Sequence, residues 1–171
     1  AEVVERMAHV DTVIFDKTGT LTAREAHEVT WHGARTNEHD RSLIRSLVRN
    51  STHPLSAVLF QELGSEMLDA RDVEEHAGQG IRGTIKGSVV RGGSAVFCGG
   101  EETSRTNGEA HVHVTIGGLH LGHYTIRKRA RNGIVAAVAR LREHVRVGLL
   151  TGDAQVDTEL AEAFHGSTVR T

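Results

Sequence analysis

A short apolar segment near the start of the chain ends in a carboxylate and a polar loop that contains glycine. Residues 11–15, Asp-Thr-Val-Ile-Phe, are rich in β-branched and aromatic side chains, which predicts a buried strand. The loop over residues 16–22 reads Asp-Lys-Thr-Gly-Thr-Leu-Thr. Open α/β sheets bind ligands at the carboxyl ends of their strands, and a glycine there lets backbone N–H groups face a phosphate. The pattern therefore favours an α/β fold in which Asp16 is a nucleophile toward a phosphoryl group.

The hydrophobic periodicity changes twice along the chain, so we expect a second unit inserted into this α/β frame. Residues 38–49 and 54–63 have the spacing of amphipathic helices, and proline suits the first position of the second one. From 73 to about 124, short alternating runs are separated by glycines, which predicts an antiparallel sheet. The alternation of strands and helices that is typical of a parallel sheet then returns, with a helix over 134–141, a strand over 145–150 and a helix over 154–164.

Composition and charge exclude several classes of protein. Of the 171 residues, 38% are hydrophobic and 25% are charged, as in soluble globular proteins. The net charge of -2 gives no electrostatic reason to expect nucleic acid as a partner. No apolar run approaches the roughly 20 residues that a membrane-spanning helix needs. Cys98 is the single cysteine, so the chain contains no internal disulfide.

A second loop of the same kind follows the strand predicted over 145–150. It reads Thr151-Gly152-Asp153 and again places a hydroxyl and a glycine between a strand and a helix. Alone, this tripeptide is more often an ordinary helix N-cap than a binding site. Two parallel strands with phosphate-type loops at their carboxyl ends converge on one ligand, however, so the pair of loops favours a shared site.

Residues 16–22 are identical to the DKTGTLT phosphorylation motif, and the chain resembles the P-type ion-pumping ATPases of the haloacid dehalogenase-like superfamily. The resemblance implies that Asp16 accepts the γ-phosphate of ATP and that Lys17 neutralises charge. It also implies that Mg²⁺ is held by the Asp16 carboxylate and the backbone carbonyl of Thr18, which lets two anions approach each other. The catalytic residues implied in this way are Asp16, Lys17, Thr18, Thr151 and Asp153.

The inserted unit resembles the nucleotide-binding domain of the heavy-metal-transporting subgroup. Residues 51–55, Ser-Thr-His-Pro-Leu, resemble its His-Pro motif, and residues 78–83, Gly-Gln-Gly-Ile-Arg-Gly, resemble its glycine-rich loop. Each motif alone is weak, because His-Pro often starts a helix and GxGxxG here lacks the context of a dinucleotide fingerprint. Their order along the chain is that of the subgroup. The ATP-binding residues that the resemblance implies are His53, Pro54, Gly78, Gly80, Ile81, Gly83 and Gly92.

Three positions depart from the pattern of the subgroup. Val48 stands five residues before the motif histidine, where the subgroup usually has a glutamate that contacts adenine. Gly92-Gly93 correspond to a Gly-Asn pair, and Tyr124 stands where an aspartate is common near the second hinge. These departures bear on the affinity for adenine and on the selectivity for ATP.

The resemblance implies a specific domain organisation and function. A partial haloacid dehalogenase-like, Rossmannoid phosphorylation domain would cover residues 1–25 and 121–171, with an α+β nucleotide-binding domain inserted at 26–120. We expect the ATP-binding and aspartyl-phosphorylation region of a heavy-metal P-type ATPase, in the cytoplasmic part of a membrane protein. Its partners would be the membrane and actuator domains and the transported ion. The family's later lysine and GDGxND loop would follow Thr171, so we expect this piece to be poorly active alone.

Two other functions are compatible with the residues. One is a soluble phosphatase of the same superfamily, although such enzymes carry a second acid where this chain has Thr18, which favours a long-lived phosphoenzyme. The other is a module that binds nucleotide without turnover. Four neighbouring histidines also raise the possibility of a metal site, but no thiolate or carboxylate lies at ligand spacing. These histidines are His111, His113, His120 and His123.

Overall fold

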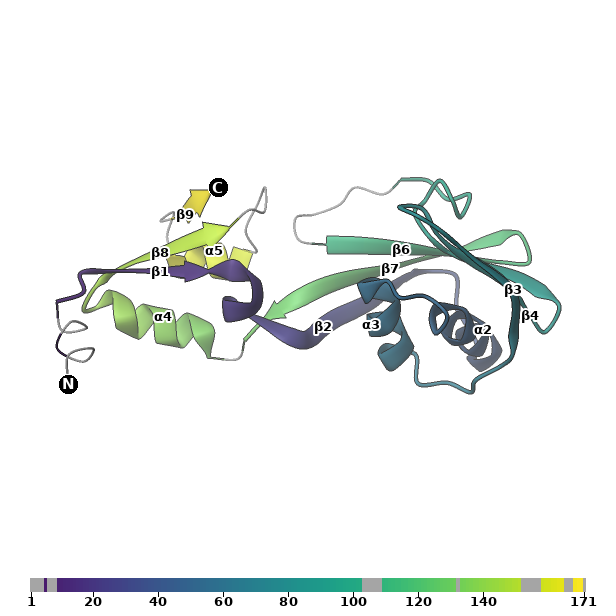
Figure 1. Ribbon diagram of the computed structural model, residues 1–171, viewed down its shortest axis with the longest axis horizontal. Helices are drawn as coiled ribbons and strands as arrows, with labels where there is room; N and C mark the ends of the chain where they lie inside the picture. The colour runs from purple at the N-terminus through teal and green to yellow at the C-terminus, as the bar shows by residue number, and fades with distance from the viewer. Residues whose placement is uncertain are drawn as a thin grey trace. The chain divides into compact units, whose positions relative to one another are not determined.

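The chain divides into two compact units, Ala1–Ala26 with Lys128–Thr171 and His27–Arg127 (Figure 1). The computed structural model describes residue 5 and residues 9–102, 109–131, 133–151, 158–164 and 168–170. The units meet at 26/27 and 127/128, one and seven residues after the domain boundaries expected from the sequence, 25/26 and 120/121. The described helices are not long and apolar enough to cross a membrane.

The first unit is a parallel three-stranded sheet covered by two helices. Its strands lie in the order β1-β8-β9, and β8 pairs in parallel with both neighbours. Helices α4 and α5 pack on one face, where Phe15, Leu149 and Phe164 share a core cluster. The elements are β1 (Thr12–Asp16), a π-helical turn η1 (Lys17–Leu21), α4 (Ile134–Arg142), β8 (Arg146–Thr151), α5 (Thr158–Phe164) and β9 (Thr168–Arg170).

The prediction that β1 is a buried strand is wrong for three of its five side chains, which are exposed. Phe15 faces the core, and its ring meets that of Phe164 edge-on at 6.0 Å between centroids. Ile14 points to the other face of the sheet and is 57% exposed. The reason is that β1 lies at the edge of the sheet, and none of the described helices covers its second face.

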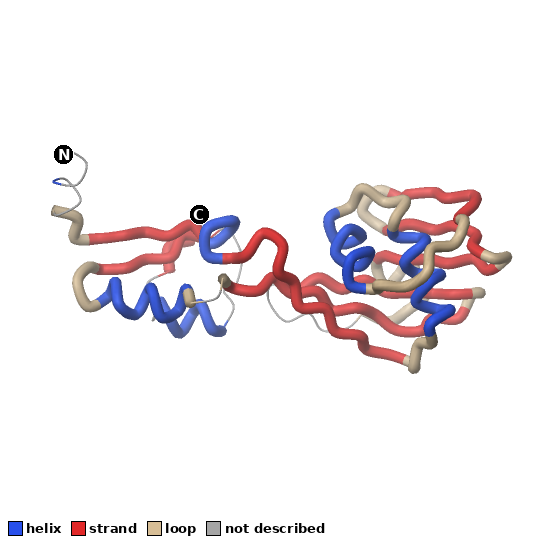
Figure 2. Tube along the Cα trace, turned by 90° about the horizontal axis from the view of Figure 1, so that it is seen from below, coloured by secondary structure: helices blue, strands red, loops and turns tan. Residues whose placement is uncertain are grey.

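The second unit is a six-stranded sheet in the order β2-β7-β6-β5-β4-β3, and its pairs from β3 to β7 are antiparallel. Figure 2 shows helices α2 and α3 lying over one face of this sheet. The elements are β2 (Thr22–Gly33), α2 (Glu38–Val48), α3 (Pro54–Glu62), β3 (Ala70–His76), β4 (Gly80–Ile85), β5 (Ser88–Gly93), β6 (Glu109–Ile116) and β7 (Leu119–Ala130).

Local signals explain where the two helices of this unit begin. Asn37 caps α2 in a capping box, because its side chain accepts from Asp40 N–H and the Asp40 carboxylate accepts from Asn37 N–H. Pro54 occupies the first turn of α3, where its missing N–H costs nothing. Both helices start where the sequence predicted. Their apolar faces meet the sheet in two core clusters that include Ile44, Leu47, Leu59, Ile81 and Tyr124.

Candidate functional site

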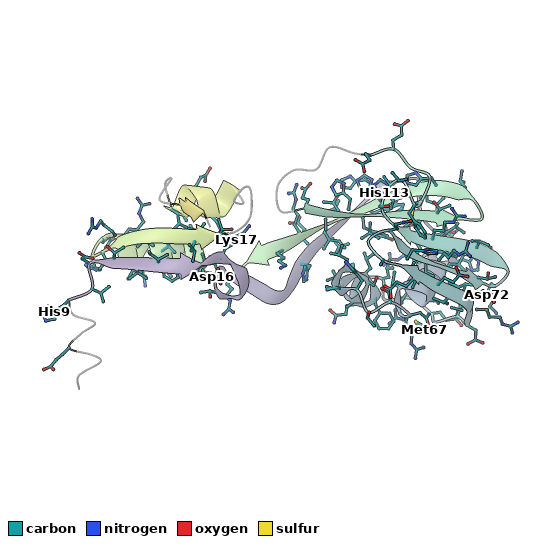
Figure 3. The ribbon with its side chains drawn as sticks, turned by 45° about the horizontal axis from the view of Figure 1, so that its top comes forward. His9, Asp16, Lys17, Met67, Asp72 and His113 are labelled. Carbon is teal, nitrogen blue, oxygen red and sulfur yellow. The ribbon has the colours of Figure 1, made fainter. Side chains whose placement is uncertain are left out.

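The first candidate site lies at the carboxyl ends of β1 and β8. Asp16 is the last residue of β1 and pairs with Leu150 in the parallel register, so Thr151 follows directly on the neighbouring strand. The Asp16 side chain is exposed, whereas Thr151 is buried. The structure therefore brings Asp16 and Thr151, which the sequence predicted to share one site, to the same edge of the sheet. Figure 3 labels Asp16 and the adjacent Lys17 at this point of the first unit.

Lys17 opens the π-helical turn that follows β1 and is 5% exposed. Leu21, at the end of the turn, is fully buried in the core, and its carbonyl accepts from Arg131 N–H at 2.8 Å. This anchor fixes the turn that carries the motif. The backbone of Thr18 lies within the turn, while its side chain is outside the described part, as are Gly152 and Asp153.

The surroundings of Asp16 fit a role in holding Mg²⁺. Its carboxylate is exposed and has no hydrogen bond or ion pair with any described residue. A carboxylate oxygen is a ligand that Mg²⁺ prefers, and this ion commonly completes its shell with phosphate oxygens and water. In the described ranges, no group of three or more His, Cys, Asp or Glu side chains could hold a metal ion by itself. Asp16 thus fits a site completed by a phosphorylated substrate.

The second candidate site is a cavity of about 310 Å³ within the second unit. It lies between the start of α3, the β3–β4 turn and strands β5 and β6. Ligand pockets commonly begin at about this size. Five of the seven residues predicted to bind nucleotide line it: His53, Gly78, Gly80, Ile81 and Gly92. Pro54 and Gly83 do not line it.

The three glycines of the 78–83 motif have three different structural roles. Gly78 has φ +70° in the β3–β4 turn, and a Cβ there would meet nothing within 4 Å. At Gly80 a Cβ would lie 2.3 Å from the Gly92 carbonyl oxygen, because the two strands approach closely. A Cβ on Gly83 would instead press on Leu47 Cδ1 at 3.1 Å, beneath α2. Only the first two therefore shape the cavity wall.

His53 combines a structural role with a place in the cavity. Its Nδ1 accepts from Leu55 N–H at 3.2 Å and caps α3. In the neutral imidazole, an accepting Nδ1 leaves the proton on Nε2, which becomes a donor for a ligand. The bond thus fixes the tautomer of the motif histidine.

Several cavity residues were missed by sequence reasoning. Glu75, His76 and His111 line the cavity, as does Ser51. The Ser51 hydroxyl donates to Glu75 Oε1 at 2.5 Å, and the His76 ring packs against Phe97 at 5.2 Å between centroids. The signal available was position, since Glu75 and His76 lie three and two residues before the first glycine of the motif. Which of them faces a ligand depends on the strand register.

The departures from the subgroup pattern have clear locations. Val48 is 3% exposed and belongs to the core between helices and sheet, so it presents no polar group to the cavity. Tyr124 packs against Trp31 at 4.6 Å between ring centroids, and burial raises the pKa of its hydroxyl to about 12. Gly93 lines the cavity, and a Cβ there would lie 2.2 Å from the Gln79 carbonyl oxygen.

The neighbouring histidines form a stacked cluster that also includes His32. The rings of His111, His113 and His32 each lie within 5.0 Å of the His123 ring between centroids. His113 Nδ1 and His120 Nε2 are hydrogen-bonded at 3.1 Å. Burial, and then the neighbouring histidines, lower the pKa of His123. The cluster is one of packed rings.

Cys98 has a packing role, as expected. Its Sγ donates to the His113 carbonyl at 3.2 Å, and burial raises the pKa of the thiol to about 11. Such a thiol is protonated at neutral pH and is a poor nucleophile.

Comparisons with known proteins give a consistent result. The model of the haloacid dehalogenase-like hydrolase family matches residues 10–169. Nitrogen fixation protein FixI of Bradyrhizobium diazoefficiens is 31% identical over 159 residues, which cover 90% of this chain and 21% of that protein. A copper-exporting P-type ATPase of Staphylococcus saprophyticus is 26% identical over 167 residues, covering 89% of this chain and 21% of that protein.

A solved structure supports the fold. The structure of a zinc-transporting PIB-type ATPase in its E2.Pi state superposes with a TM-score of 0.80 at 23% identity, over 98% of this chain and 30% of that chain. This chain spans about a fifth of the length of the curated relatives it matches. The predicted α/β fold class and family are thereby confirmed. The chain belongs to the haloacid dehalogenase-like hydrolase family and is similar to a segment of heavy-metal P-type ATPases.

Proposed function

We propose that this chain binds ATP and is phosphorylated on Asp16 as part of a heavy-metal cation pump. The observation that carries the proposal is the register of β1 and β8, which sets the exposed Asp16 beside the carboxyl end of β8 at Thr151. The cavity with His53 and the glycine motif in the other unit supports it. We assign phosphorylation to residues 1–25 and 121–171 and nucleotide binding to residues 26–120.

The proposed reaction is an in-line phosphoryl transfer. An Oδ of Asp16 forms a bond to the γ-phosphorus while the bond to the β,γ-bridging oxygen breaks and ADP leaves. Lys17 offsets negative charge, Thr18 and Thr151 position the phosphoryl oxygens, and Asp153 belongs to the same proposed catalytic set. The Asp16 carboxylate and the Thr18 carbonyl would hold Mg²⁺, which would supply charge neutralisation to the reaction. Water then attacks the phosphorus, which releases phosphate and restores the carboxylate.

The nucleotide is held by the cavity of the second unit. His53 donates from Nε2, and Gly78, Gly80 and Gly92 let the ligand approach the backbone closely. Ile81 supplies apolar surface, while Pro54 and Gly83 support the site from α3 and from beneath α2. In the whole pump, we propose that hydrolysis drives a metal ion across the membrane through membrane and actuator domains outside this chain, with this region on the cytoplasmic side.

The test is incubation with γ-labelled ATP and Mg²⁺, in this chain and in the longer protein. Acid-stable, hydroxylamine-sensitive label that disappears in Asp16→Asn is the expected result. Asp11→Asn is the matched control, because Asp11 is an exposed carboxylate that pairs with Arg146 at the other end of β1. Release of free phosphate without a labelled intermediate would instead indicate a phosphatase. If nucleotide binds but neither label nor phosphate forms in the longer protein, the proposal is wrong and a binding module remains.

A further inference from the structure

The nucleotide cavity contains a carboxylate whose role is not assigned by the proposed function. Among the described residues that line the cavity, Glu75 is the only acidic one, and no lysine or arginine lines it. A carboxylate accepts hydrogen bonds and repels phosphate oxygens. The part of ATP that lies against Glu75 must therefore be one that offers N–H or O–H donors, not the triphosphate.

The segment before α3 holds the Glu75 carboxylate in place. Ser51 Oγ donates its proton to Glu75 Oε1 at 2.5 Å and accepts from His53 N–H at 3.1 Å. No other described side chain bonds to the carboxylate, so Oε2 keeps its full capacity to accept. The acceptor is therefore oriented before a ligand arrives.

The register of the sheet sets this acceptor beside an apolar surface. Glu75 pairs with Ile81 across β3 and β4, and Ile81 pairs with Gly92 across β4 and β5. Directly opposite residues project to the same face, so Glu75 borders the apolar side chain of Ile81, with the bare backbone of Gly92 beyond it. A flat aromatic base that lies on Ile81 and Gly92 presents its edge to Glu75.

We infer that Glu75 is a specificity-determining residue that accepts a hydrogen bond from the exocyclic amino group of adenine. This inference rests on the proposed function, since it assigns the orientation of ATP in the same cavity. Val48 lies in the core, so α2 supplies no competing acceptor at that position. Inosine triphosphate carries a carbonyl in place of the amino group. The oxygen of that carbonyl cannot donate a hydrogen bond and is repelled by the Glu75 carboxylate.

The experiment is calorimetric titration of the full chain with ATP, inosine triphosphate and 2′-deoxy-ATP. Glu75→Gln keeps the size of the side chain and adds an N–H donor that suits the inosine carbonyl. We expect its ratio of ATP affinity to inosine triphosphate affinity to fall by roughly tenfold or more, which is the effect of one hydrogen bond to a charged group. Ser51→Ala frees the carboxylate and lowers the same ratio by a smaller factor.

Glu74→Gln is the matched control, because Glu74 is the neighbouring carboxylate and forms an exposed ion pair with Arg82 at 2.8 Å. Its affinity ratio should equal that of the unchanged protein. The inference is overturned if Glu75→Gln leaves the ratio unchanged, or if it alters the ratio of ATP to 2′-deoxy-ATP instead, which would indicate a ribose contact. Failure to bind any of these nucleotides would remove the proposed function itself, and this inference with it.

Discussion

At the scale of single residues, the glycines show how one sequence motif hides several physical causes. Gly78 needs its left-handed φ, Gly80 needs the space taken by the Gly92 carbonyl, and Gly83 makes room under Leu47. The motif pattern identified all three as nucleotide residues. Only strand pairing, which brings Gly80 opposite Gly93, separates the residues of the cavity wall from the residue that packs against the helix.

The two cavity glycines should therefore respond differently to alanine. Gly78→Ala has space for a methyl group and loses about 1 kcal/mol, the cost of a left-handed backbone for alanine. Gly80→Ala adds a backbone clash and should lose about 3 kcal/mol or more. Urea unfolding followed by the fluorescence of Trp31, the only tryptophan, measures both. Equal losses would contradict the close approach of β4 and β5.

His123 makes the second unit sensitive to acid. Its pKa is lowered by burial and by His111, His32 and His120, so the unfolded chain binds a proton more readily than the folded chain. The free energy of unfolding is then unaffected above about pH 7.5 and falls as pH drops through the usual histidine pKa of about 6.5 and below. Urea midpoints at pH 8 and pH 5.5, read from Trp31, test this.

The histidine cluster provides its own control. His123→Gln should reduce the fall in stability between these two pH values, because the stacked ring no longer has to stay neutral. His39→Gln changes an exposed histidine of α2 and should leave the fall as it was. If the unchanged protein, His123→Gln and His39→Gln lose the same amount of stability between the two pH values, other groups set the acid sensitivity.

At the scale of elements, the sequence predicted those whose periodicity is strong. Helices α2, α3 and α4 and strand β8 lie where the apolar spacing indicated, and Thr158–Phe164 falls within the last predicted helix. Strand β2 was missed, because Val29 and Trp31 are the only apolar residues with clear alternation in Thr22–Gly33. The three-residue strand β9 is too short to leave a pattern.

Two further differences arise from tertiary contacts. The sequence predicted that Gly122 interrupts a strand, yet β7 runs through it. Glycine is needed there because a Cβ would lie 2.2 Å from the His32 carbonyl oxygen of β2. In the cavity, Glu75 and His111 could not be predicted, since a one-residue change of register turns every side chain to the other face. The places of Asp16 at the end of a strand and of His53 at the start of a helix were predictable, because each depends on local sequence signals.

The start of α3 allows capping to be separated from ligand binding. His53→Ala removes the acceptor for Leu55 N–H and should lower the unfolding free energy by about 1 kcal/mol, together with a loss of ATP affinity. His53→Asn keeps a good capping acceptor and should recover the stability but not the affinity. Urea unfolding and calorimetric titration with ATP measure the two effects. Recovery of both would show that the imidazole does not contact the nucleotide.

At the scale of the whole molecule, the two candidate sites belong to units with separate cores. Leu21, Leu149 and Phe164 form the cluster of the first unit, whereas Leu59 and Ile81 belong to the clusters of the second. Asp16 and the cavity of the second unit are therefore stabilised by different sets of buried residues. A destabilising substitution in one core should therefore impair the proposed function of its own unit before that of the other unit.

A pair of core substitutions tests this division. Leu149→Ala and Leu59→Ala each truncate a fully buried side chain, at an expected cost of about 2–5 kcal/mol to the unit concerned. Leu149→Ala should raise amide exchange in β1 and β8 and reduce labelling of Asp16 while leaving ATP affinity and the Trp31 transition unchanged. Leu59→Ala should lower ATP affinity and the Trp31 midpoint. Because each core is local, amide exchange in β1 and β8 should stay at its original rate in Leu59→Ala. A rise in that exchange as large as the one in Leu149→Ala would show that the two units unfold as one cooperative body.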